Sequence, residues 1–252
     1  MNWRALAVGA GLAGALTAAA AGCSGPSKPA PTIPTTTVPA TTTTVTVAGV
    51  QTSGIRTVLS PIGLNIRQAP SKEAKILAGV AQGSELTVTG HTASAGGWYQ
   101  VKGRTVTGWI TADPSLTAEG KFSSFSSSPL GFSVLYPDTW TAKEGALAAV
   151  FKAPSGPDTV TVTPAKAVAL LGHGRAGYVL ADREQIVACG VTTTLDSYTA
   201  DAAPGVYLAQ VRIKVSAGHA LGIDGLVTGL AGLAVMRDFT NSITFASPLC
   251  QG

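Results

Sequence analysis

From Val50 to about Leu116 the sequence is divided into short runs of alternating apolar and polar residues separated by glycines. In the first run, Leu64 and Ile66 alternate with Asn65 and Arg67, and this period of two places the pairs on opposite faces of a strand. Similar runs follow at residues 76–80, 83–88, 97–101 and 107–110. Only 12% of the residues are charged, which favours short strands over long helices stabilised by salt bridges. The pattern predicts a small all-β module over residues 50–116.

The order of these runs resembles the bacterial SH3-like family. The matching motifs are Leu64–Pro70, Gly83–Val88, Gly97–Val101 and Gly108–Ile110, and the resemblance covers essentially the whole of residues 50–116. It implies a small, strongly curved SH3-like β-barrel of the kind found in actinobacterial envelope lipoproteins. Such a barrel binds peptides or cell-wall stem peptides in a shallow groove and performs no chemistry.

The same resemblance suggests which residues line the groove. Trp98, Tyr99 and Trp109 are the aromatic candidates, because aromatic side chains supply large, rigid contact areas. Asn65 and Arg67 are the polar candidates, because they face away from the Leu64 side of their strand. The alternative for each is structural: the aromatics complete the core of a small barrel, and the polar pair is simply solvated.

Charge is unevenly divided along the chain. Residues 51–115 carry six basic and three acidic side chains, a net charge of +3, whereas residues 116–252 carry nine basic and ten acidic, a net charge of −1. The basic balance of the first module favours an anionic wall or membrane surface. There is no Lys/Arg run or basic–aromatic interleaving, so no nucleic-acid partner is expected.

The first 22 residues have the pattern of a signal peptide. A short basic start, Met1–Arg4, precedes an apolar stretch, Ala5–Ala19, that is shorter than a membrane-spanning helix. Ala20-Ala21-Gly22-Cys23 resembles the lipobox of bacterial lipoproteins, although that family prefers Leu where Ala20 stands. The resemblance implies a lipidated (palmitate-bearing) Cys23 and a lipid anchor on the extracytoplasmic face of the cell membrane. The alternative is ordinary cleavage that releases a secreted protein.

Residues 23–49 are rich in Thr and Pro and contain no aromatic side chain. Such a segment buries too little apolar surface to offset its ordering entropy, so we expect a disordered tether. A serine-rich stretch at residues 117–128 is expected to be a second, shorter linker.

Residues 129–252 form the second expected domain. Its opening, Gly131–Trp140, and its ending, Asp238–Phe245, resemble the PsbP-like family, which implies an antiparallel sheet with packed helices that serves docking. We expect an alternating strand at Tyr207–Val215 and helices at Ala176–Cys189 and Leu230–Ile243, the latter followed by a short strand. The predicted fold class is therefore multidomain: a small all-β barrel followed by an α+β domain.

Two cysteines remain once Cys23 is set aside. In an oxidising compartment Cys189 and Cys250 are expected to form a disulfide. The alternatives are free thiols, or a catalytic thiol assisted by His173 or His219, although neither histidine stands at a recognisable spacing from a cysteine.

The sequence contains no G-x-S-x-G, H-E-x-x-H or P-loop motif, and its one G-x-G-x-x-G match, Gly9–Gly14, lies within the predicted signal peptide, so we expect no catalytic residues, no metal and no cofactor. The leading hypothesis is a non-catalytic cell-envelope lipoprotein whose barrel binds peptidoglycan or an envelope protein or peptide. The alternatives are an accessory regulator of a wall hydrolase, or an enzyme with an unrecognised site in residues 129–252.

Overall fold

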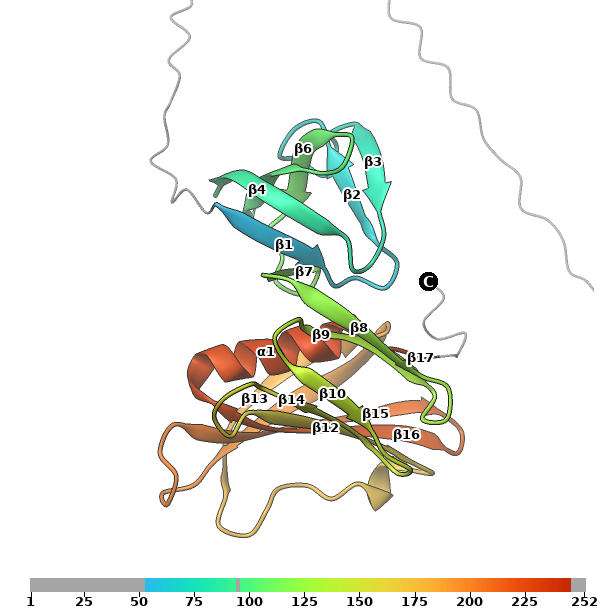
Figure 1. The fold of residues 1–252 in the computed structure, drawn as a ribbon, viewed down its shortest axis with the longest axis vertical. Coiled ribbons are helices and arrows are strands. Elements are labelled where there is room, and N and C mark those ends of the chain that lie inside the picture. The colour runs from blue at the N-terminus through green and yellow to red at the C-terminus, as the bar shows by residue number, and fades with distance from the viewer. Residues whose placement is uncertain (1–52, 94–95, 246–252) are drawn as a thin grey trace, which may run out of the picture. The chain divides into compact units, whose positions relative to one another are not determined.

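The computed structural model describes residues 53–93 and 96–245 (Figure 1). These residues belong to one compact unit. The expected signal peptide, the lipidated Cys23 and the tether at residues 23–49 lie outside the described residues, as does Cys250. No helix in the described part of the chain is long and apolar enough to cross a membrane.

The first module is a sheet of seven antiparallel strands (Figure 1). The strands are β1 (Gly54–Val58), β2 (Leu64–Arg67), β3 (Ile76–Val80), β4 (Glu85–Thr92), β5 (Trp98–Lys102), β6 (Thr107–Thr111) and β7 (Thr117–Glu119), in the order β3-β2-β6-β5-β4-β1-β7. Alternate residues of these strands form one apolar core: Val58, Ile66, Leu86, Val88, Val101 and Ile110. The small all-β module predicted from the sequence is thus confirmed.

One glycine of this barrel is required by a close approach of the backbone. Gly108 of β6 lies so near β2 that a Cβ atom would stand 2.5 Å from the carbonyl oxygen of Arg67 and 2.7 Å from Cγ2 of Ile66. Any larger residue at position 108 would push β6 away from β2. These two strands are joined through the cross-strand pair of Arg67 with Trp109.

The stretch expected to be a linker, residues 117–128, differs from that expectation because most of it is strand. β7 pairs with β1, and β8 (Phe122–Ser127) pairs along its whole length with β9 (Phe132–Pro137). Phe122 and Phe125 belong to this serine-rich run and pack against apolar clusters. Pairing with distant strands therefore overrides the local preference of serine for loops.

The second domain is built on another sheet of seven antiparallel strands (Figure 1). These are β10 (Thr141–Glu144), β11 (Ala149–Lys152), β12 (Thr159–Ala165), β13 (Val179–Ala188), β14 (Val191–Thr199), β15 (Val206–Ser216) and β16 (His219–Thr228), in the order β10-β11-β12-β16-β15-β14-β13. Helix α1 (Gly229–Ser242) and the small sheet β17-β9-β8, in which β17 is Thr244–Phe245, contribute to the same core as this sheet. Phe239 of α1, for example, lies 4.8 Å from Phe151 of β11, measured between ring centroids.

Three expectations for this domain are met. The alternating strand at Tyr207–Val215 is β15, in which Ala209, Val211 and Ile213 are fully buried. The helix expected at Leu230–Ile243 is α1, and a short strand follows it.

The helix expected at Ala176–Cys189 was wrong, and the expected fold class is correct only in part. Residues Val179–Ala188 form strand β13, and α1 is the single α-helix in the described residues, so the domain is mostly β-sheet rather than a sheet with several packed helices. The spacing of the apolar residues in this segment suits both the period of a helix and the period of a strand. A two-residue turn, in which Cys189 and Gly190 both have positive φ (52° and 74°), returns the chain so that β14 pairs along β13.

Candidate binding groove of the barrel

A groove of about 260 Å³ crosses the surface of the barrel. It is lined by Leu64, Asn65, Arg67, Lys72, Trp98, Thr111, Asp113 and Leu116. Three of the five residues predicted to bind a ligand, Asn65, Arg67 and Trp98, are therefore brought together, although they come from β2 and β5, which are not neighbours in the sheet.

The register of three strands explains this meeting. β6 lies between β2 and β5 in the sheet order. Arg67 is the cross-strand partner of Trp109, and Trp98 is the partner of Thr111. Directly paired residues point to the same face of a sheet, and so do residues two apart on one strand. Arg67, Trp98 and Thr111 consequently share the face opposite to the core residue Ile110.

Two cationic side chains and one carboxylate give the groove its polar character. Arg67 donates a hydrogen bond of 2.8 Å from Nη1 to the carbonyl oxygen of Ala74, which ties the loop after β2 to the groove. Lys72 belongs to that loop and is exposed. Asp113 stands beyond β6, and its Oδ1 accepts hydrogen bonds from the amide (2.8 Å) and the hydroxyl (2.6 Å) of Ser115.

Trp98 lines the groove but is only 3% exposed. Its indole Nε1–H is buried and has no hydrogen-bond partner among the described residues. A buried donor without a partner is costly, typically by about 1–3 kcal/mol. A ligand or water acceptor that reached this nitrogen would recover that cost.

The other two aromatic candidates, Tyr99 and Trp109, do not line the groove. Tyr99 follows Trp98 in β5, points to the opposite side and packs against the barrel core. Its hydroxyl accepts a hydrogen bond of 2.8 Å from Arg56, whose guanidinium also lies 4.4 Å from the ring centroid. Trp109 is half-buried and lies beside Arg67 on the groove face, but it is not among the residues that line the groove.

Lys72 and Asp113 line the groove and were not predicted from the sequence. Both belong to loops, and no motif marks either residue, because a loop side chain is placed by the fold of the strands around it. The positive charge of the module, noted from the sequence, was the only signal that pointed to Lys72.

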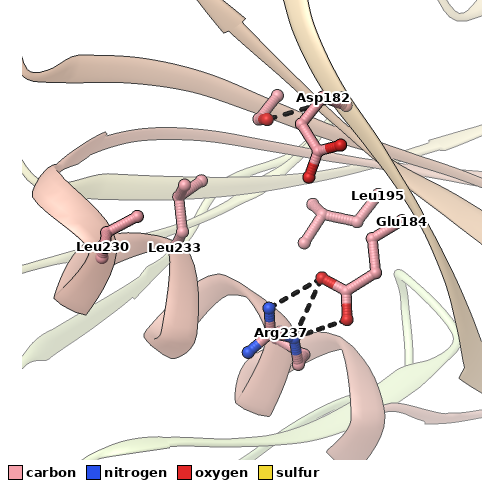
Figure 2. Close-up of a pocket in the computed structure, with 7 residues that line it drawn as sticks. Asp182, Glu184, Leu195, Leu230, Leu233 and Arg237 are labelled. Carbon is pink, nitrogen blue, oxygen red and sulfur yellow. Dashed lines mark hydrogen bonds and ion pairs between the residues drawn. The ribbon is translucent and has the colours of Figure 1, made fainter.

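A second groove, of about 290 Å³, lies in the C-terminal domain between α1 and strands β13 and β14 (Figure 2). In the part of the chain that the structure describes, no group of three His, Cys, Asp or Glu side chains is placed to hold a metal ion. Cys189 is buried in the turn after β13, whereas the side chains of His173 and His219 are exposed.

Comparison with known proteins bears on both parts of the chain. Residues 62–113 match the model of the bacterial SH3 domain family. The chain is also similar to the solution structure of cyanobacterial PsbP (CyanoP) from Synechocystis sp. PCC 6803, with 14% sequence identity and a TM-score of 0.38, over 49% of this chain and 92% of that one. No curated protein matches the chain. Residues 62–113, which contain the groove residues Asn65, Arg67 and Trp98, therefore form a bacterial SH3 domain.

Proposed function

We propose that this protein is a non-catalytic cell-envelope lipoprotein whose SH3 domain binds a cell-wall stem peptide, and hence peptidoglycan, in the barrel groove. The observation that carries the proposal is the convergence of Trp98, Asn65, Arg67 and Lys72 on one groove. A bacterial SH3 domain is associated with binding to the cell wall or to proteins, and this groove is where the described side chains suit such a ligand.

The groove matches the chemistry of a short peptide that carries carboxylates. Arg67 and Lys72 contribute two positive charges and Asp113 one negative charge, which leaves a net charge of +1. The half-buried side chains of Leu64 and Leu116 line the same groove and offer an apolar contact beside these charges. Free carboxylates of a stem peptide would pair with the cations, and Asp113 would accept from an amino group of the same peptide.

Binding is expected to be weak. A groove of about 260 Å³ is smaller than most sites for drug-sized ligands. An affinity of micromolar or weaker, which is at most about −8 kcal/mol, follows from the small area buried. Because the groove is open to solvent, its charge attraction is screened and binding decreases as the salt concentration rises.

The anchoring part of the proposal rests on the sequence alone. Cys23 follows an apolar stretch and the small residues Ala21 and Gly22, which supports lipidation and export. The expected product is anchored to the extracytoplasmic face of the cell membrane and carries its SH3 domain on the Thr/Pro tether. Intact mass and membrane fractionation of the wild type and of Cys23→Ala test this, and a wild-type protein found without lipid in the medium contradicts it.

The groove is tested by co-sedimentation of the chain from residue 24 onward with purified peptidoglycan, and by calorimetry with an isolated stem peptide. Lys72→Ala is expected to weaken binding about two- to fivefold, the range for loss of one exposed ion pair. Asn65→Ala should weaken it by a similar factor. Lys102→Ala is the matched control, because it removes the same charge from an exposed position of β5 outside the groove.

Each outcome separates the parts of the proposal. No retention on peptidoglycan at low salt contradicts wall binding and makes an envelope protein the leading ligand. Retention that Lys72→Ala and Lys102→Ala reduce equally contradicts the groove and indicates non-specific charge attraction. Release of soluble wall fragments by the purified chain contradicts the non-catalytic role.

A further inference from the structure

The groove of the C-terminal domain joins an apolar wall to an acidic one (Figure 2). Helix α1 contributes Leu230, Leu233 and Arg237, and the strands contribute Asp182, Glu184, Leu195 and Ser197. Leu230 is 78% exposed, an unusual position for a leucine at the start of a helix that otherwise packs on the sheet. Single exposed apolar residues are common, but this one borders a groove.

Strand β13 forms the rim of this groove and is the last strand of its sheet. The strand spans ten residues, and three large apolar side chains along it are exposed: Val179 (72%), Leu180 (43%) and Val187 (51%). A long edge strand with exposed apolar residues is a template on which another extended chain can pair through main-chain hydrogen bonds.

The charges on β13 are paired, except for one. Arg183 binds Asp196 of β14 at 2.7 Å, and Glu184 binds Arg237 of α1 at 2.7 Å. The carboxylate of Asp182 has no hydrogen-bond or ion-pair partner among the described residues, whereas its carbonyl oxygen accepts from Ser197. Figure 2 shows the Asp182 side chain on the strand side of the groove, across from Leu230 and Leu233. With Asp182 and Glu184 negative and Arg237 positive, the groove carries a net charge of −1.

The charge order of β13 disfavours pairing with a second copy of itself. In an antiparallel pair, residues directly opposite each other have side chains on the same face of the sheet. When the two strands are copies related by a two-fold axis, one residue must therefore stand directly opposite its own copy, and the axis passes between them. Registers that overlap most of Val179–Ala188 place this axis at Arg183 or Glu184. The register centred on Arg183 places Arg183 opposite its own copy and Asp182 opposite Glu184 of the other copy. The register centred on Glu184 places Glu184 opposite its own copy. Like charges directly opposite are destabilising, so the occupant is a different chain.

We propose that β13 and this groove bind an extended segment of another protein, which adds to the sheet as an eighth strand. The segment carries a Lys or Arg that pairs with Asp182, next to an apolar side chain that covers Leu230 and Leu233. Main-chain hydrogen bonds to β13 supply affinity, and the two side chains supply specificity. This interaction surface belongs to the C-terminal domain and is independent of peptide binding by the SH3 domain.

The test uses two capped seven-residue peptides and the chain from residue 24 onward. One peptide is Thr-Leu-Thr-Lys-Thr-Leu-Thr, which presents Leu, Lys and Leu on one face of a strand, and the other has Glu in place of Lys. Binding is followed by amide NMR shifts and by hydrogen exchange. The Lys peptide is expected to shift and protect amides of β13 and the first turn of α1, and to bind at least fivefold more tightly than the Glu peptide.

Variants distinguish this site from non-specific attraction. Asp182→Asn should abolish the preference for the Lys peptide, and Leu230→Ala should weaken both peptides. Asp138→Asn, at an exposed position in the turn after β9, should leave both affinities unchanged. The proposal is overturned if the two peptides bind equally, if protection maps outside β13, or if β13 amides alone show concentration-dependent broadening without peptide, which would identify a second copy as the occupant.

Discussion

Arg183 and Asp196 face each other across β13 and β14 and are joined by two hydrogen bonds, Nε to Oδ1 at 2.7 Å and Nη2 to Oδ2 at 2.8 Å. The two ends of the pair lie in different surroundings. The side chain of Asp196 is 5% exposed, whereas that of Arg183 is 58% exposed. The hydrogen bonds from Arg183 hold the pKa of Asp196 below its ordinary value. The stability that this carboxylate contributes is therefore present above about pH 4 and is lost as the pH falls through its lowered pKa.

The asymmetry of this pair leads to the first prediction. Arg183→Ala should lower the free energy of unfolding at pH 7, because the buried carboxylate of Asp196 loses its main partner. Urea titrations followed by circular dichroism measure this. The double variant Arg183→Ala/Asp196→Asn should recover part of the loss, since it removes the buried charge. A double variant less stable than Arg183→Ala alone would contradict the explanation.

Gly108 provides a prediction for the barrel. Gly108→Ala should destabilise it by at least about 2 kcal/mol, because the added methyl group would stand 2.5 Å from the backbone oxygen of Arg67 and the strands must separate. Gly54→Ala is the matched control, since a Cβ at Gly54 meets nothing within 4 Å. Thermal unfolding of the two variants is the measurement. Equal melting temperatures for Gly108→Ala and Gly54→Ala would show that β6 accommodates the added methyl group and would contradict the prediction.

Asp238 of α1 is expected to give the stability of the folded protein a pH dependence opposite to that of Asp196. Burial raises the pKa of Asp238 to about 7, and the nearby positive charges of Arg237 and Arg56 offset this only in part. Between about pH 4 and pH 7 the folded protein holds a proton that the unfolded chain has released, so stability decreases as the pH rises. The slope is at most about 1.4 kcal/mol per pH unit.

The measurement compares wild type with Asp238→Asn in urea unfolding at pH 5 and pH 8. The Asn side chain is neutral at both values, so the variant should gain stability relative to wild type as the pH rises. Stability curves of the two proteins that run parallel across this range would show that Asp238 does not titrate there.

The pairing of Cys189 with Cys250 stays a prediction, because Cys250 lies outside the described residues. Cys189 is buried in a tight turn, a position that suits a structural role better than catalysis. Peptide mapping without reductant should recover the two cysteines in one linked peptide. In the chain-entropy model, a disulfide that closes the loop between Cys189 and Cys250 stabilises the folded state by roughly 4 kcal/mol. Alkylation of both thiols in the native protein would refute the disulfide.

The barrel is specified by local patterns in the amino-acid sequence. Period-two runs bounded by glycines leave few alternatives to short strands, and the order of four motifs identifies the module from its residues alone. The same period places Asn65 and Arg67 on one face of β2, where both line the groove. For Trp98 and Tyr99, adjacent residues of β5, the sequence requires opposite faces. It does not say which of them faces the groove.

The folded sheet makes that choice, and it also selects which loop residues join the groove. Lys72 and Asp113 line it because the loops after β2 and β6 flank strands that meet only in the folded sheet. Likewise, residues 179–188 have an apolar spacing that suits helix or strand, and pairing with β14 through the turn at Cys189 and Gly190 selects the strand. Local patterns specify alternation within a segment, whereas the choice between faces and between partners depends on non-local pairing and burial, which no single segment encodes.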